Sequence, residues 1–215
     1  MAEITAQIVK KLREETGAGM MECKNALNET GGDFEKAKLV LRKRGIAIAD
    51  KKSARAAKEG IIASYIHVGD KVGVLVEVNC ESDFVGRNPD FREFVKNITL
   101  QIAAAEPRYV SREDVPAALI EREKEVASAQ VKNKPPQAIA KIVEGKLDKF
   151  YQTVCLMEQG YVRDQNITIK DLVTATVAKL GENILIRRFI RWKVGESLDM
   201  PVPTTETPAA EPAQA

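Results

Sequence analysis

The segment from Gly60 to Cys80, GIIASYIHVGDKVGVLVEVNC, places a Gly-Asp pair between two runs rich in β-branched residues. Gly69-Asp70 is a signature of a two-residue hairpin turn, so the two runs are predicted to pair as antiparallel strands. In the register that this turn sets, alternate residues of both strands share one face, namely Ile61, Ala63, Tyr65, Val72, Val74, Val76 and Val78. We expect that face to be buried.

A third strand is predicted at ENILIRRFIRWKV, residues 182–194. There, Ile184, Ile186, Arg188, Ile190 and Trp192 alternate with Leu185, Arg187, Phe189 and Arg191. This strand arrives long after the hairpin in the sequence, and the chain between them has the spacing of helices. The predicted core is therefore α+β: a small antiparallel sheet covered by helices.

Several start signals place those helices. Asn88 is a good N-cap for a helix with Pro89 at its first position. A charged helix at 116–130 and another from Pro135 are predicted to form an antiparallel helical hairpin, with a separate helical stretch after Gly145. The capping box Thr168-Ile169-Lys170-Asp171 begins a further helix, which ends at Gly181.

Residues 1–45 are predicted to form a module of three short helices, with Gly45 in the left-handed position after the third. The small basic segment 46–59 is interpreted as a linker with partial helical character. Residues 60–196 then form the core. Residues 197–215 hold four of the nine prolines and are predicted to be a disordered tail.

Charge is dense but balanced, with 33 Lys and Arg against 31 Asp and Glu and a net charge of +2. This balance argues against a protein that coats the nucleic-acid backbone, so we expect no direct nucleic-acid binding. The cysteines Cys23, Cys80 and Cys155 lack zinc-finger or redox spacing, which is typical of free thiols in a reducing cytosol. Without a secretory signal or a membrane-length apolar run, a cytoplasmic protein with no membrane contact is predicted.

Enzymatic chemistry is not expected. No glycine-rich phosphate loop follows a strand, and His67, the only histidine, has no acid–nucleophile pair beside it. We therefore interpret His67 as structural and assign no catalytic residue, metal ligand or cofactor. The third strand carries a basic run, Arg187, Arg188, Arg191 and Lys193. Without aromatic residues interleaved on the same face, this run fits a charged sheet edge better than an RNA surface.

Two short segments are left open between a structural and a binding role. Met20-Met21 is a soft apolar pair that is ordinarily core filler, yet it stands between two helices, where partial exposure would make it a contact surface. In ESDFVGRNPD, residues 81–90, Phe84 could anchor beneath the sheet while Asp83 caps a turn. Alternatively, Phe84 stands in a polar connection after a strand that valines already fill, and is an exposed anchor for another protein.

Five motifs occur in order along residues 1–197. They are TGAGMMECKNAL at 16–27 with GGDFEKA following, VEVNCESDFVGRN at 76–88, VSREDVP at 110–116, IVEGKLDKF at 142–150 and GENILIRRFIRWKVGE at 181–196. Together they closely resemble the short form of the bacterial translation elongation factor Ts family. The resemblance implies a guanine-nucleotide exchange factor for elongation factor Tu, with no catalytic chemistry of its own. It also implies a ubiquitin-associated-like three-helix module joined to an α+β core that serves in dimerisation.

The resemblance further implies site residues and partners. The segment Ser82, Asp83, Phe84 and Val85 matches the part that enters the GTPase near its Mg²⁺ site, while Arg13, Met20, Met21 and Lys24 match N-terminal positions that touch its nucleotide domain. The implied partner is GDP-bound elongation factor Tu, and short members of the family pair through their sheets, which implies a homodimer. A helical adaptor that binds ubiquitin-like or nascent-chain partners is the alternative from another class.

Overall fold

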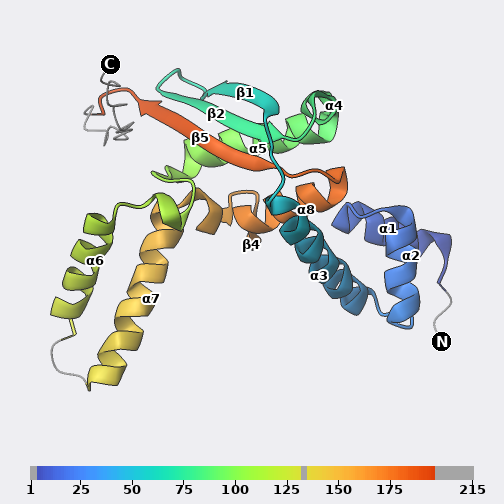
Figure 1. Ribbon diagram of the computed structural model, residues 1–215, viewed down its shortest axis with the longest axis horizontal. Coiled ribbons are helices and arrows are strands. Elements are labelled where there is room, and N and C mark those ends of the chain that lie inside the picture. Colours follow the sequence, from blue (N-terminus) through green and yellow to red (C-terminus); the bar gives the residue numbers. More distant parts are fainter. Residues whose placement is uncertain (1–3, 132–134, 197–215) are drawn as a thin grey trace, which may run out of the picture.

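The computed structural model describes residues 4–131 and 135–196 and confirms the predicted α+β class (Figure 1). Its helices are α1 Ala6–Thr16, α2 Met20–Glu29, α3 Phe34–Ser53, α4 Asp83–Arg87, α5 Pro89–Ala105, α6 Ala117–Ala129, α7 Pro136–Val154 and α8 Ile169–Leu180, with 3₁₀ turns η1 Arg112–Asp114 and η2 Leu156–Glu158. Its strands are β1 Glu59–Ile66, β2 Val72–Cys80, β3 Gly160–Tyr161, β4 Asp164–Thr168 and β5 Leu185–Lys193. The tail predicted at 197–215 lies outside the described residues.

The main sheet is antiparallel, with the strand order β1-β2-β5. The β1–β2 hairpin has the predicted register, in which Tyr65 stands opposite Val74. Gly69 and Asp70 both adopt positive φ, 92° and 56°, which is why this turn needs residue types that tolerate the left-handed region. The alternate valines of β2 from Val74 to Val78 are buried, so the predicted core face of this strand is confirmed.

Strand β5 pairs with β2, but the alternation predicted for it is wrong in its second half. Two consecutive residues of β2 pair with Ile186 and Arg188, so the residue between these two is an extra one on β5. This β-bulge moves every later side chain to the opposite face. Ile186 is buried before the bulge; after it, Phe189 packs against the core while Trp192 is half exposed.

Helices α5 and α8 cover the inner face of the sheet (Figure 1). Helix α5 begins as predicted: the Asn88 side chain accepts the N–H of Asp90 at 2.8 Å, and Pro89 occupies the first position. Helix α8 begins with the predicted capping box at Thr168 and ends at Gly181. Their apolar residues join the valines of β2 in a single hydrophobic core, and Val85 from the segment between β2 and α5 packs against it.

The three N-terminal helices pack around a core of their own, formed by Val9, Leu12, Cys23, Ala26, Leu27, Ala37 and Leu41. The predicted end of the third helix at Gly45 is wrong, because α3 continues as one helix to Ser53. Gly45 is buried, and a Cβ there would lie 3.5 Å from Ala178 of α8, so α3 packs directly on the core. The predicted linker therefore starts inside a helix. The domain boundaries and the likeness to ubiquitin-associated modules stay predictions.

Helices α6 and α7 form the predicted antiparallel hairpin and project away from the sheet (Figure 1). The break predicted at Gly145 is wrong: α7 is one helix of 19 residues. The small sheet of β3 and β4 was missed, because strands of two and five residues are too short for a periodic signal. The buried Gln101 side chain ties α5 to this sheet, donating to the Gly160 carbonyl at 3.1 Å and accepting the Val162 N–H at 2.9 Å.

Candidate protein-binding site

The segment after β2 forms the five-residue helix α4, where the sequence predicted a polar connection. Ser82 is its N-cap, and the Ser82 side chain accepts the N–H of Val85 at 3.5 Å. Val85 packs against the core and Gly86 is buried, whereas the Phe84 side chain is 79% exposed. One side of α4 thus rests on the core, and the other side presents an aromatic ring to solvent.

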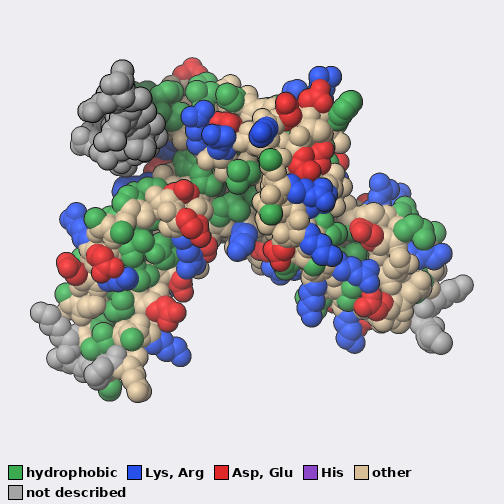
Figure 2. Space-filling model, viewed as in Figure 1, with side chains coloured by type: hydrophobic (Ala, Val, Ile, Leu, Met, Phe, Trp, Pro, Cys, Tyr) green, Lys and Arg blue, Asp and Glu red, His purple; other side chains and the backbone are tan. Residues whose placement is uncertain are grey.

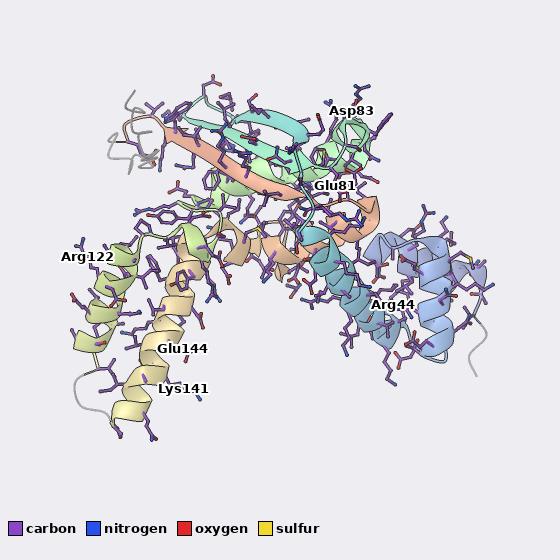
Figure 3. All side chains as sticks on the ribbon, in the orientation of Figure 1. Arg44, Glu81, Asp83, Arg122, Lys141 and Glu144 are labelled. Atoms are coloured by element: carbon purple, nitrogen blue, oxygen red, sulfur yellow. The ribbon has the colours of Figure 1, made fainter. Side chains whose placement is uncertain are left out.

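The interpretation of Phe84 as an anchor beneath the sheet is therefore wrong. Asp83 does not cap the turn either, since Ser82 does so, and Asp83 instead pairs with Arg87 one turn later at 2.7 Å. Exposed pairs of this spacing contribute only about 0.3–0.5 kcal/mol. In Figure 3, Asp83 lies on α4 at the outer edge of the molecule, with Glu81 closer to the rest of the core. An exposed aromatic ring on a supported turn is typical of an anchor for another protein.

The base of α4 is tied to the loop between α8 and β5. The Glu182 carboxylate accepts the N–H groups of Glu81 and Ser82, both at 3.0 Å, and the Ser82 hydroxyl at 2.6 Å. Glu81 in turn accepts the N–H of Asn183 at 2.7 Å. We call these four residues, Glu81, Ser82, Glu182 and Asn183, the clasp. The clasp could not be predicted from the sequence, because Ser82 and Glu182 stand 100 positions apart and no local spacing connects them.

The clasp carries a carboxylate that is stabilised in its ionised form. The N–H of Asn183 holds the pKa of the Glu81 carboxyl below its usual value, and the Arg55 guanidinium, 3.4 Å away, acts in the same direction. A carboxyl whose pKa is lowered on folding stabilises the fold above the unfolded-state pKa, and this contribution is lost as the pH falls through the folded-state value. Glu81 is therefore ionised, and bonded, at neutral pH.

The N-terminal module presents a second exposed group of predicted site residues. Met20 and Met21 are 44% and 65% exposed in the first turn of α2, so their interpretation as core filler is wrong. Lys24 is also exposed and follows one turn later, beside both methionines. Arg13 is exposed in the last turn of α1. Along the longest axis of the molecule, this module and α4 lie toward the same end, and the α6–α7 hairpin lies at the other (Figure 1).

The histidine and the cysteines take structural positions. His67 lies just beyond β1, exposed, with its Nδ1 atom 2.9 Å from the Tyr65 hydroxyl. Burial raises the pKa of all three thiols, that of Cys155 to about 11, so they are protonated at neutral pH. Across residues 4–131 and 135–196, no three His, Cys, Asp or Glu side chains are grouped so that they could hold a metal ion. None of the helices in these ranges has the length and apolar character needed to cross a bilayer.

The basic run on β5 is paired with acidic side chains. Arg188 and Arg187 lie 2.7 and 3.7 Å from the Glu77 carboxylate. The Arg191 side chain, only 8% exposed, pairs with Glu106 at the end of α5. Positive charges that are already compensated attract a phosphate backbone weakly, which favours the structural interpretation of this run over an RNA surface.

One family model and several known proteins resemble the chain over nearly its whole length. The model described as elongation factor TS matches residues 2–196. Elongation factor Ts of Thermodesulfovibrio yellowstonii is 58% identical over 197 residues, covering 91% of this chain and 98% of that protein. The proteins of the same name from Coprothermobacter proteolyticus and Anaeromyxobacter sp. are 60% and 57% identical; the matches cover 90% and 93% of this chain and 100% and 92% of those proteins.

Proposed function

The chain belongs to the elongation factor Ts family, and from that premise we propose that it is a guanine-nucleotide exchange factor for elongation factor Tu. In this role it binds the GDP-bound GTPase in the cytoplasm and speeds GDP release during translation elongation. The observation that best supports the proposal is the exposure of Phe84 on α4, a helix that is held at its base by the clasp. A 79% exposed phenylalanine has no packing role in this chain, and a partner surface would account for it.

The proposed mechanism is mechanical. The segment Ser82, Asp83, Phe84 and Val85 acts as a wedge. Its exposed tip, Asp83 and Phe84, enters the GTPase near its Mg²⁺ site, while Ser82 and Val85 hold the segment to the core. Burying the Phe84 ring in the partner contributes roughly 2–3 kcal/mol. A ring and a carboxylate pushed into this region displace residues around Mg²⁺, whose octahedral shell tolerates little distortion, so the metal and phosphate contacts weaken. Because coupling between two ligands is reciprocal, rebinding of nucleotide then releases the factor.

The decisive experiment follows fluorescent GDP as it leaves elongation factor Tu. Addition of a substoichiometric amount of the chain, with excess unlabelled GDP, should accelerate release of the labelled nucleotide on every GTPase molecule. A rate equal to that of the GTPase alone would refute the proposal. The alternative function, a helical adaptor for ubiquitin-like or nascent-chain partners, predicts no GTPase partner whose binding depends on nucleotide.

The N-terminal module is proposed to supply a second contact through Arg13, Met20, Met21 and Lys24. This contact lies away from the wedge. Its loss should therefore weaken binding to the GTPase more than it lowers the rate of GDP release from the bound complex. Replacing both Met20 and Met21 by alanine is expected to raise the half-saturating factor concentration about tenfold, equivalent to about 1.4 kcal/mol. The maximal rate of GDP release should change less than threefold. Leu39→Ala, at a 57% exposed position of α3, is the matched control.

The outer face of the main sheet supports a proposed homodimer. The register places Ile66, Gly73 and Trp192 side by side across the three strands. On the same face, Leu75 stands opposite Ile190 as the neighbouring cross-strand pair. Ile66, Leu75 and Trp192 are 60%, 39% and 50% exposed, and together they form an apolar patch on one face. A second copy that presents the same face would bury both patches, since two-fold interfaces use the same surface twice.

Replacing Trp192 by glutamate should therefore shift the chain to the monomer. Sedimentation equilibrium is expected to give twice the monomer mass for the wild type, and the monomer mass for this variant at the same concentration. Leu39→Glu, at a 57% exposed position of α3 and outside the sheet, is the control for added charge. A monomeric wild type, or a dimer that persists in Trp192→Glu, would contradict the proposed interface.

A further inference from the structure

We propose that Glu182 is a positioning residue for nucleotide exchange: through the clasp it fixes α4 in the orientation that presents Phe84. The inference rests on the proposed function and assigns a role to a residue outside the wedge. Glu182 contributes no atom to the exposed tip. Its carboxylate instead spans the two residues that lead into α4, bonding the N–H groups of Glu81 and Ser82 and the Ser82 hydroxyl.

Helix α4 needs such an external support because of its length. It has five residues, and a helix this short does not hold itself together in water. Its own N-cap bond, from the Val85 N–H to the Ser82 hydroxyl, is long at 3.5 Å. The Asp83–Arg87 pair bridges residues within the same helix and fixes nothing to the core. The charged bonds to Glu182 are shorter and stronger, and they start from a different part of the chain.

The clasp also connects the wedge to the end of α3. Glu81 pairs with Arg55 at 3.4 Å, and the Asn183 side chain donates to the Arg55 carbonyl at 2.8 Å. Arg55 follows α3, the helix that carries the N-terminal module and packs on α8. The proposed wedge and the proposed second contact are therefore fixed to one framework. Because Phe84 is already held in its binding orientation, it loses less conformational entropy on docking. A larger share of the interaction energy is then left to distort the GTPase.

The test compares Glu182→Leu with Glu182→Gln. Leucine has a similar volume and accepts no hydrogen bond, so the N–H groups of Glu81 and Ser82 lose their acceptor. Glutamine can still accept both N–H groups with its carbonyl oxygen while its amide donates to the Ser82 hydroxyl. In the fluorescent-GDP assay, Glu182→Leu is expected to lower the maximal release rate about tenfold while the half-saturating concentration changes less than threefold. Glu182→Gln should restore the rate to within threefold of the wild type.

The matched control is Asp114→Asn. The Asp114 carboxylate makes the same kind of bonds, to the N–H and hydroxyl of Ser111, both at 2.8 Å, at the start of η1. This variant should exchange nucleotide like the wild type, because η1 is tied to α7 through the Arg112–Asp148 pair and is not part of the clasp. A wild-type rate in Glu182→Leu would overturn the proposal, and so would a tenfold loss that Glu182→Gln fails to restore.

Amide hydrogen exchange on the free chain separates failure of this inference from failure of the proposed function. Exchange at Glu81 and Ser82 should quicken at least tenfold in Glu182→Leu and stay slow in Glu182→Gln. Unchanged exchange in Glu182→Leu would overturn the clasp even if the wild type releases GDP as proposed. If Glu182→Leu lowers the melting temperature of the whole chain, Glu81→Ala decides, since it removes the clasp bond to the Asn183 N–H and leaves every wedge residue in place. It should lower the maximal rate about threefold, and an unchanged rate would count against the proposal.

Discussion

At saturating factor concentration, the Phe84→Ala variant is expected to release GDP from elongation factor Tu about 30- to 100-fold more slowly than the wild type. Truncation removes the ring whose burial in the partner contributes roughly 2–3 kcal/mol, and each 1.4 kcal/mol corresponds to a factor of ten. The free energy of unfolding should stay nearly constant, because the side chain is 79% exposed in the free chain. Stopped-flow release of fluorescent GDP gives the rate, and urea unfolding gives the stability.

Two further variants make this result specific. Asp83→Ala should slow release in the same direction, because its carboxylate is the other group that the proposed wedge would bring to the Mg²⁺ site of the GTPase. Val126→Ala removes a side chain of α6 that is 47% exposed at the opposite end of the molecule, and it should leave the rate unchanged (Figure 1). If both Phe84→Ala and Asp83→Ala retain full activity at low factor concentration, the wedge mechanism is wrong.

Features with a local cause could be predicted from the sequence. The β1–β2 register follows from a turn of adjacent residues and from strict alternation, and both lie within one short window. The start of α5 at Asn88 and that of α8 at Thr168 depend on caps that contact residues two or three positions away. In each case the sequence window contains both partners of the interaction, so the pattern is sufficient.

Two glycines were wrongly predicted to end or interrupt helices, because their positions depend on packing elsewhere in the fold. Gly45 was predicted to end a helix, but it lies where α3 meets Ala178 and leaves room for that approach. Gly145 lies inside α7, and a Cβ there would meet nothing within 4 Å. A single glycine costs a helix about 1 kcal/mol relative to alanine, which is too little to end one that tertiary packing supports.

The site could be predicted in part. Exposure of Phe84 follows from the valines that already fill β2, and it was one of the two alternatives predicted for this residue. The support of the wedge could not be predicted, because Glu182 meets Ser82 only after β5 has paired with β2. Figure 2 adds a general reason: acidic and basic side chains are interspersed over this face, so charge alone marks no one spot as the site. Which carboxylates stabilise the fold depends on contacts between residues that are far apart in the sequence.

Gly60→Ala should have the largest effect on stability, with a loss of about 3 kcal/mol or more in the free energy of unfolding. Gly60 adopts φ +141°, a region that side chains disfavour, and a Cβ there would lie 2.2 Å from the Val78 carbonyl oxygen of the paired strand. Backbone atoms of β2 cannot yield without breaking the hairpin. Since the Gly60 carbonyl also lies against Gly86, the change disturbs the surface on which α4 rests, and exchange activity should fall with the fold. Urea unfolding followed by circular dichroism measures the loss.

Gly145→Ala is the control of opposite sign: a gain of about 0.5–1 kcal/mol is expected, because alanine favours the helix and nothing obstructs it. A Gly60→Ala variant within 1 kcal/mol of the wild type would mean that β1 can shift away from β2 at this point. The base of the wedge would then be less rigid than the clasp requires.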